Sequence, residues 1–236
     1  RSLHRPGDPL LLPNAWDVAT ARAVVAAGFP VVATTSAGVA QALGHEDHEA
    51  APPDEMLAAA ARIAHGVDVP VTVDAEAGYG MEPDALVEAL RRAGAAGCNL
   101  EDTDHASGRL RDPDRHAAWL DAVRRAAAAD GYRLVINARI DVLLGPLLAG
   151  APPGTQAELL PDALRRAHAY LDAGVDCVYP IGLWEPDPLR RFTAEAGGPV
   201  NVIRLPQTPS LAELAAQGVA RVSWGPFLFR EAMARF

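Results

Sequence analysis

The residues of this chain best suited to chemistry are acids that directly follow a strand-like segment. Residues 71–73 are β-branched and come after a proline, which predicts a short buried strand, and Asp74 and Glu76 then follow two positions apart. If the strand continues to Glu76, both carboxylates point to the same side, where like charges repel unless a cation or a shared proton lies between them. Ligands that offer only oxygen favour a hard ion such as Mg2+, which keeps several of its waters. The competing interpretation is that Asp74 caps the following helix and Glu76 lies in solvent.

The composition excludes several classes of function. All 21 residues counted as Lys plus Arg are arginines, and Schiff-base aldolases, pyridoxal phosphate enzymes and P-loop proteins each need a lysine amine. A formal net charge of −9 argues against nucleic acid or an anionic membrane surface as a partner. No apolar stretch approaches the roughly 20 residues of a membrane span, and the first residues lack the pattern of a signal peptide. We therefore expect neither a nucleic-acid partner nor a membrane partner.

The two cysteines point to a reducing compartment. Cys98 and Cys177 each lie in an apolar, strand-like run. Thiols in such runs are typically buried and reduced, and neither paired in a disulfide nor bound to a metal. This pattern predicts a cytoplasmic protein.

Helical and strand-like segments alternate along the chain, and the alternation predicts the fold class. We expect strands at residues 10–13, 31–35, 71–73, 97–100, 134–138, 177–180, 200–205 and 221–224. We expect helices at residues 17–27, 54–65, 82–92, 113–129, 158–173, 188–196 and 210–217, several of them ended by a glycine. Residues 36–53 are expected to form a long loop, and residues 145–154 an irregular insertion. Eight strands separated by helices favour an α/β fold, a (β/α)8 TIM barrel forming a single domain over residues 1–236, with a doubly wound open sheet as the alternative.

A barrel would bring the chemical residues together. The carboxyl ends of all barrel strands share one face, and active sites lie there. Asp74, Glu76, Glu101 and Arg139 follow strands directly, and the 36–53 loop follows the second strand. Their expected convergence favours a metal site over a set of isolated surface charges.

Several motifs, in this order and spacing, resemble one known family. They are Leu12-Pro13-Asn14-Ala15-Trp16-Asp17, Thr35-Ser36-Ala37, Leu43-Gly44-His45-Glu46-Asp47, Val73-Asp74-Ala75-Glu76-Ala77-Gly78-Tyr79-Gly80, Asn99-Leu100-Glu101-Asp102 and Asn137-Ala138-Arg139-Ile140-Asp141. Over nearly its whole length the chain resembles the isocitrate lyase and phosphoenolpyruvate mutase superfamily. The resemblance implies a phosphoenolpyruvate mutase-like barrel that uses Mg2+, with Mn2+ possible, and that acts on small 2-oxo acids through an enolate of pyruvate. It also implies a homo-oligomer, either a tetramer or a dimer.

The resemblance also implies roles for individual acids. Asp74 matches the principal metal carboxylate, while Glu76, Glu101 and Asp47 match residues that act mainly through metal-bound waters. Glu76 stands where many members have aspartate. Asp47, Glu101 and Arg139 are the residues expected to take part in catalysis. A divalent cation chelated by the ketone and carboxylate oxygens of the substrate would stabilise the enolate charge as a Lewis acid.

Further residues match the substrate site. Thr35, Ser36 and Ala37 match the segment whose backbone N–H groups and hydroxyl hold the substrate carboxylate. Arg139 matches the substrate-binding arginine, with a surface salt bridge to Asp141 as the competing interpretation. Two residues near the seventh strand are weaker candidates for a second substrate carboxylate, Asn201 and Arg204. For Arg204, a surface salt bridge is an equally good interpretation.

The loop after the fourth strand, residues 103–110, which we call the lid loop, bears on the leaving group. Lyases of this family carry Lys-x-Cys-Gly there and use the thiol as an acid, whereas this chain has Ser107-Gly108 in a shorter loop without lysine. The mutases carry an asparagine in that loop, and this loop has none. The resemblance therefore favours a decarboxylase or hydrolase type acting on oxaloacetate or another 2-oxo dicarboxylate. Three histidines near the mouth are candidates for proton transfer: His45, His48 and His105.

Two alternatives remain open. The first is an enzyme that breaks or moves a carbon–phosphorus bond, of the phosphonopyruvate hydrolase or phosphoenolpyruvate phosphonomutase type. The second is a 2-oxo acid binding protein without catalysis, which the missing lid residues favour and the intact acids and Arg139 oppose.

Overall fold

A computed structural model describes all 236 residues of the chain. The chain divides into two compact units, each built from several stretches of sequence. The first unit comprises residues 1–11, 101–121 and 137–222, and the second comprises residues 12–100, 122–136 and 223–236. We describe each unit by itself, and the prediction of a single domain stays a prediction.

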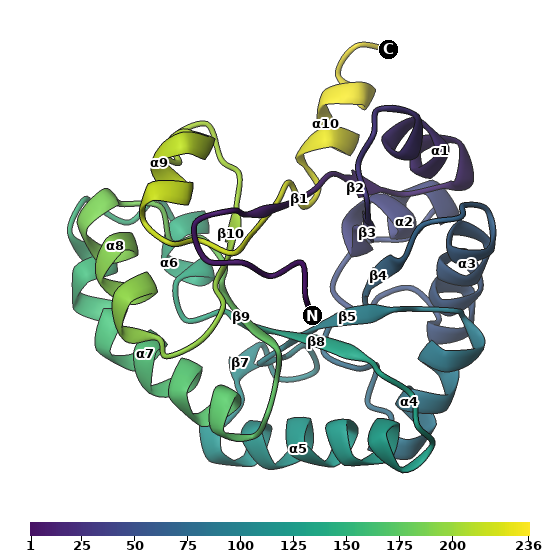
Figure 1. Cartoon of the computed structure of the whole chain (residues 1–236), viewed down its shortest axis with the longest axis horizontal. Helices are drawn as coiled ribbons and strands as arrows, with labels where there is room; N and C mark the ends of the chain where they lie inside the picture. Colours follow the sequence, from purple (N-terminus) through teal and green to yellow (C-terminus); the bar gives the residue numbers. More distant parts are fainter. The chain divides into compact units, whose positions relative to one another are not determined.

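The second unit is built on parallel strands with helices between them (Figure 1). Its strands are β2 (Asn14–Ala15), β3 (Val32–Thr34), β4 (Val71–Asp74) and β5 (Gly97–Glu101), of which residues 97–100 belong to this unit. They pair in that order and in parallel, with Asn14 opposite Ala33, Val32 opposite Val71 and Thr72 opposite Gly97. Its helices are α1 (Val18–Ala26), α2 (Ser36–Leu43), α3 (Pro53–His65), α4 (Pro83–Arg92) and α10 (Phe227–Met233). A parallel order of this kind needs a crossover between strands, and α1, α3 and α4 provide these crossovers.

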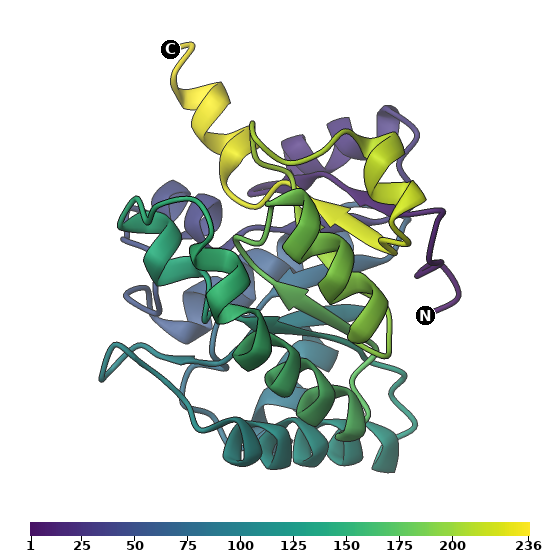
Figure 2. The ribbon, with the colours of Figure 1, turned by 90° about the vertical axis from the view of Figure 1, so that its left-hand side faces the viewer.

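The first unit repeats the same alternation. Its strands are β1 (Leu10–Leu12), β8 (Val135–Ile140), β9 (Cys177–Pro180), β10 (Asn201–Ile203) and β11 (Arg221–Ser223), where β1, β8 and β11 each extend past the unit's limits. The pair β8 and β9 is parallel, and β1, β11 and β10 form a sheet in that order. Its helices are α6 (Leu144–Leu148), α7 (Thr155–Asp172), α8 (Pro186–Glu195) and α9 (Leu211–Ala216), and α5 (Pro113–Ala129) begins here and continues into the second unit. Figures 1 and 2 show α7 and α8, drawn in green, packed side by side.

Most of the predicted elements lie within three residues of their observed bounds, because their end signals are local. Asp17 begins α1 as predicted: its Oδ1 accepts a hydrogen bond from the Thr20 N–H at 2.7 Å, and the Thr20 side chain bonds back to complete a capping box. Cys98 and Cys177 are both buried, and neither forms a disulfide, as predicted. No helix of the structure has the length and apolar character needed to cross a membrane.

Two predictions of irregular structure were wrong. Residues 36–43 of the expected long loop form α2, which ends at Gly44 in the left-handed conformation. Part of the expected insertion at residues 145–154 forms the short helix α6. In addition, the lid loop contains an unpredicted hairpin of β6 (Thr103–Asp104) and β7 (Arg109–Leu110), which pair antiparallel.

The last helix of the chain packs against the first strand of the second unit. The Asn14 side chain donates to the Thr34 carbonyl at 2.7 Å, and its Oδ1 accepts from the N–H groups of Trp224 and Gly225, each at 2.8 Å. The Trp16 and Phe229 rings meet edge to face with centroids 5.2 Å apart. Residues from both ends of the sequence therefore complete this unit.

Candidate functional site

In the second unit, Asp74 stands at the carboxyl end of β4 and reaches the start of α2. Its Oδ2 accepts a hydrogen bond from the Ser36 N–H at 3.0 Å, and its own N–H donates to the Thr34 hydroxyl at 2.8 Å. Ser36 is the first residue of α2, and Thr35, the N-cap residue, makes no side-chain cap bond. Asp74 therefore supplies a cap to α2, and the interpretation that it caps the helix after its own strand was wrong.

In the predicted carboxylate-binding segment, Thr35 to Ala37, two of the backbone N–H groups already make hydrogen bonds within the protein. The Thr35 N–H donates to the Ala15 carbonyl at 3.2 Å, and the Ser36 N–H donates to Asp74. The Ala37 N–H and the hydroxyls of Thr35 and Ser36 are the donors that the segment could offer a substrate. All three residues are buried.

Glu76 is buried, with 3% of its surface exposed, so the interpretation that it lies in solvent was wrong. The strand β4 ends at Asp74, and Glu76 has a φ of +48°, so the strand alternation expected to align the two acids does not extend to Glu76. Its Oε2 accepts a hydrogen bond from the Glu49 N–H at 2.5 Å. Sequence reasoning gave Glu49 no role.

Asp47 lies in the loop between α2 and α3. Its Oδ1 is buried and has no hydrogen-bond partner in the structure. A buried carboxylate oxygen without a partner is rare in native proteins and is typically satisfied by water or an ion. No three His, Cys, Asp or Glu side chains lie close enough together to form a metal-binding cluster. The assignment of Asp47, Asp74, Glu76 and Glu101 to one metal ion stays a prediction.

In the first unit, Arg139 on β8 pairs with two acids at once. It contacts the Glu101 carboxylate through Nη1, and it bonds Asp141 through Nε at 2.6 Å and Nη2 at 3.0 Å. Only 8% of the Arg139 surface is exposed. The competing interpretation predicted a salt bridge between Arg139 and Asp141 at the surface. The ion pair is present, but it is buried. A bidentate pair of this kind fixes the guanidinium plane as well as its charge.

Glu101 also contacts His105, whose Nε2 lies within hydrogen-bond distance of Oε1. Both carboxylate oxygens of Glu101 therefore have partners within the first unit. Of the other two histidines considered for proton transfer, His45 contacts Glu55 at 3.3 Å and His48 is exposed with a φ of +67°. His105 thus contacts a predicted site residue, Glu101, within the first unit.

Asp102 lies behind this ion pair and carries a network that the sequence did not reveal. Its Oδ1 accepts from the Asp141 N–H at 2.9 Å, and its Oδ2 accepts from Arg166 Nη1 at 2.8 Å and from the Tyr170 hydroxyl at 2.6 Å. Asp102 is completely buried. Arg166 and Tyr170 are one turn apart on α7, so they share a helix face. The chain of contacts runs from α7 through Asp102 to the residue that orients Arg139.

The two buried acids of this network have opposite pKa shifts. Burial raises the pKa of Asp102, the negative charge of Asp141 adds to the rise, and the bonds from Tyr170 and Arg166 oppose it. Burial would also raise the pKa of Asp141, but the Arg139 guanidinium and the hydrogen bonds from Arg139 and Thr103 outweigh it and lower that pKa. Asp141 is therefore the firmer anion, and it holds Arg139 in place.

The lid hairpin uses its serine internally. The Ser107 hydroxyl donates to Asp104 Oδ2 at 2.6 Å, and the Ala106 N–H donates to Asp104 Oδ1 at 3.2 Å. The hydrogen bond from Ser107 lowers the pKa of Asp104. The residue that stands in place of the lyase cysteine is thus part of a turn.

The weaker substrate candidates differ in their surroundings. Asn201 begins β10 and is completely buried. Arg204 donates through Nη1 to the carbonyls of Leu205, Thr208 and Pro209, at 3.1, 2.6 and 3.3 Å. The expected surface salt bridge of Arg204 is absent, and the side chain holds its own loop together.

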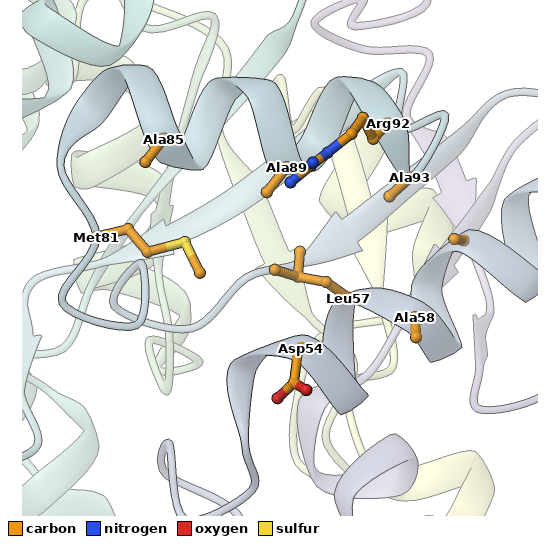
Figure 3. A pocket seen from close by; sticks show the side chains of 9 residues that line it. Asp54, Leu57, Ala58, Met81, Ala85, Ala89, Arg92 and Ala93 are labelled. Atoms are coloured by element: carbon orange, nitrogen blue, oxygen red, sulfur yellow. The ribbon is translucent and has the colours of Figure 1, made fainter.

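The second unit also has a groove between α3 and α4 with a volume of about 440 Å³ (Figure 3). Its walls are mostly apolar, with Asp54 and Arg92 as the charged residues. None of the predicted site residues lines this groove. It is separate from the residues that carry the proposed chemistry.

Comparisons with known proteins decide the family. The sequence model of the phosphoenolpyruvate phosphomutase family matches residues 1–236. The chain belongs to this family. Within it, an uncharacterized protein of Mycobacterium tuberculosis is 36% identical over 94% of this chain and 80% of its own length. A probable 2-methylisocitrate lyase of Corynebacterium glutamicum is 34% identical over 80% of this chain and 60% of its own length.

Solved structures of the family share the fold. A Burkholderia cenocepacia J2315 protein with the provisional name phosphonomutase has a TM-score of 0.90 and 44% identity, covering 99% of this chain and 94% of its own. A 2,3-dimethylmalate lyase of the phosphoenolpyruvate mutase and isocitrate lyase superfamily has a TM-score of 0.83 and 26% identity, covering 100% of this chain and 82% of its own. These similarities confirm the predicted family and the predicted α/β barrel fold class. The family includes lyases and phosphomutases.

Proposed function

We propose that this protein is a Mg2+-dependent enzyme that cleaves a bond beside the ketone of a small, oxaloacetate-like 2-oxo acid through an enolate of pyruvate. The observation that carries the proposal is the buried Asp47 Oδ1 without a protein partner, in a unit whose Asp74 and Glu76 are further acids at predicted ligand positions. A donor set of carboxylates alone suits Mg2+, or Mn2+, better than a softer ion. Asp74, Glu76 and Asp47 would hold the cation directly or through water. We keep Glu101 in the proposal as a fourth acid, which would act through a metal-bound water. When bound, the cation would supply Lewis-acid stabilisation of the developing enolate charge.

The residues of the chain would bind and orient the substrate. Arg139 is fixed by Asp141 and buried, so its positive charge needs no reorganisation when an anion develops near it. The Ala37 N–H and the Ser36 hydroxyl would hold the substrate carboxylate at the start of α2, where the helix dipole favours negative charge. His105 would be the group through which a proton enters or leaves near Glu101.

The lid supports loss of a small group over cleavage of a larger acid. Two relatives are named for larger acids, as a probable 2-methylisocitrate lyase and a 2,3-dimethylmalate lyase. In this chain the hydroxyl of Ser107 donates to Asp104, and a serine hydroxyl is a far weaker acid than a thiol. Decarboxylation or hydrolysis of an oxaloacetate-like substrate does not need that thiol.

A carbon–phosphorus bond enzyme is the second candidate. The Burkholderia cenocepacia protein with the provisional name phosphonomutase is 44% identical, and the phosphoenolpyruvate phosphomutase of Streptomyces hygroscopicus is 30% identical over 98% of this chain. A binding protein without turnover is the third. We also propose a cytoplasmic homo-oligomer, a tetramer or a dimer, which sedimentation equilibrium of the purified protein tests.

The deciding experiment measures pyruvate release from oxaloacetate, phosphonopyruvate, dimethylmalate and methylisocitrate, with Mg2+ and with a chelator. The test variant is Asp74→Asn, because an amide oxygen can still accept from the Ser36 N–H and keep the cap on α2. Loss of several kcal/mol of charge stabilisation predicts a fall in kcat of about 10²-fold or more. Asp68→Asn, at an exposed position, is the control and should match the wild type. Turnover that survives both the chelator and Asp74→Asn refutes the metal role, and binding of a 2-oxo acid without any turnover supports the third candidate.

A further inference from the structure

Four residues other than glycine adopt the left-handed backbone conformation, and all four lie in two loops of the second unit. His48 and Glu49, with φ of +67° and +58°, lie between α2 and α3. Glu76 and Tyr79, with φ of +48° and +57°, lie between β4 and α4. Such residues are strained and persist only where their surroundings hold them, and they cluster at functional sites.

Two hydrogen bonds tie the loops to each other. The Glu49 N–H donates to Glu76 Oε2 at 2.5 Å, and the Tyr79 N–H donates to Glu49 Oε1 at 2.6 Å. Glu49 thus gives a bond with its backbone and accepts one with its side chain. Both acceptors are carboxylates, so both bonds are charge-assisted and stronger than those between neutral groups. Each donor is the N–H of a left-handed residue, so these bonds act where the backbone is strained.

The tied loops carry predicted metal carboxylates. Asp47 precedes Glu49 by two residues, and Asp74 precedes Glu76 by two. The Glu76 carboxylate is held directly by the Glu49 N–H, and Asp47 carries the buried oxygen without a partner. The position of Glu49 therefore affects both loops at once.

We propose that Glu49 is a positioning residue that ties the 44–52 loop to the 75–80 loop and so orients Asp47 and Glu76. Its effect on a cation rests on the proposed function, whereas the tie between the loops does not. Glu49 itself does not contact the substrate in this proposal. Its side chain is needed for its acceptor oxygen and not for a proton or a metal bond.

The chain offers matched variants. Glu49→Ala removes the acceptor of the Tyr79 N–H, while Glu49→Gln keeps a carbonyl oxygen at the same reach. Glu46→Ala, at an exposed position in the same loop, is the control. The first readout is amide hydrogen exchange at Glu49 and Tyr79 without metal. We expect exchange at Tyr79 to rise by about tenfold or more in Glu49→Ala and to stay near the wild-type rate in Glu49→Gln and Glu46→Ala.

The second readout is calorimetric titration of the same proteins with Mg2+ alone. Loss of a residue that orients a metal carboxylate typically weakens metal affinity by about 10–100-fold, which is the change expected in Glu49→Ala. In turnover assays of Glu49→Ala the Mg2+ concentration for half activation should rise while kcat at saturating Mg2+ changes little, and in Glu49→Gln the half-activation concentration should stay near the wild-type value. A purely structural loss would not be rescued by excess Mg2+.

Three results would each contradict a different part of the proposal. Unchanged exchange at Tyr79 in Glu49→Ala overturns the tie between the loops. Faster exchange with an unchanged Mg2+ affinity overturns the positioning role and leaves the proposed function standing. A wild-type protein that binds no Mg2+ overturns the cation of the proposed function, together with the positioning of its ligands.

Discussion

Arg166→Met should destabilise the protein because it leaves the buried Asp102 carboxylate without its cation. Arg166 Nη1 donates to Asp102 at 2.8 Å, to the Arg111 carbonyl at 3.0 Å and to the Tyr170 hydroxyl at 3.3 Å. Only 6% of the Arg166 side chain and none of the Asp102 side chain is exposed, so water cannot replace the lost partner. Methionine has a similar length and fills the space without a charge.

The expected loss follows from the unpaired acid. Removing one partner of a buried ion pair costs about 3–5 kcal/mol in free energy of unfolding, more than the loss of a hydrogen bond to a charged group, which is about 1.5–3 kcal/mol. Burial already raises the pKa of Asp102, and loss of the Arg166 charge raises it further. The native state then binds a proton that the unfolded chain releases above the ordinary aspartate pKa of 3.8, so stability falls as the pH rises. The loss should therefore be smaller at about pH 5.5 than at about pH 7.5.

Urea unfolding followed by circular dichroism, at both pH values, measures this. Arg165→Met is the matched control, since Arg165 lies next to Arg166 on α7, is 57% exposed and pairs only with Asp162 at the surface. Its cost should stay below about 1 kcal/mol. The double variant Arg166→Met with Asp102→Asn should recover most of the loss, because the amide carries no charge. If Arg166→Met costs as much in the Asp102→Asn background as in the wild type, the reasoning is refuted.

Two further predictions test other buried groups by thermal unfolding. His116 is buried with neither ring nitrogen bonded, and burial, with the charges of Arg111 and Arg166, lowers its pKa from 6.5 to about 3. Below about pH 6.5 this histidine binds a proton in the unfolded chain but not in the native state, so the free energy of unfolding falls by up to a few kcal/mol as the pH drops towards 3. His116→Phe should reduce this fall. A fall as steep as in the wild type would contradict the assignment. In Gly97→Ala, the new Cβ would lie 2.7 Å from the Val135 carbonyl oxygen. The free energy of unfolding should therefore fall by about 1–3 kcal/mol. An unchanged Tm would contradict this, because it would show that the strands move apart without loss of stability.

Much of the fold could be predicted because its signals lie close together in the sequence. Asp17 begins α1 through bonds within a few residues, and Gly28, with a φ of +89°, follows the C-cap of that helix. The start of α2 could not be predicted in the same way, because its cap is Asp74, which is 38 residues away and reaches Ser36 across the unit. Because Thr35 makes no side-chain cap bond, the start of α2 has no local capping signal in the sequence.

The site shows the same division between local and distant signals. The position of Asp74 and Glu101 at the ends of predicted strands indicated that they belong to the site. The resemblance to the family indicated a substrate-binding role for Arg139. Asp102 stood in one of those motifs, yet its partners lie 64 and 68 residues further along, at Arg166 and Tyr170. A signal was present: an arginine and a tyrosine one turn apart on the face of α7 that otherwise carries buried apolar residues. For Glu49 and His48 the sequence carried no such signal, because a left-handed backbone conformation of residues other than glycine depends on contacts that are distant in the sequence.

The packing of the last helix against the first strand sets an order on folding. Asn14 Oδ1 is satisfied by the N–H groups of Trp224 and Gly225, more than 200 residues later, and Trp16 packs against Phe229. At a synthesis rate of about 5–20 residues per second, about 10 to 40 seconds pass between the appearance of Asn14 and that of Trp224. Throughout that interval the Asn14 Oδ1 lacks these two donors, and the Trp16 ring lacks its contact with Phe229. We therefore expect the growing chain to depend on chaperones that shelter this surface until Trp224, Gly225 and Phe229 have left the ribosome.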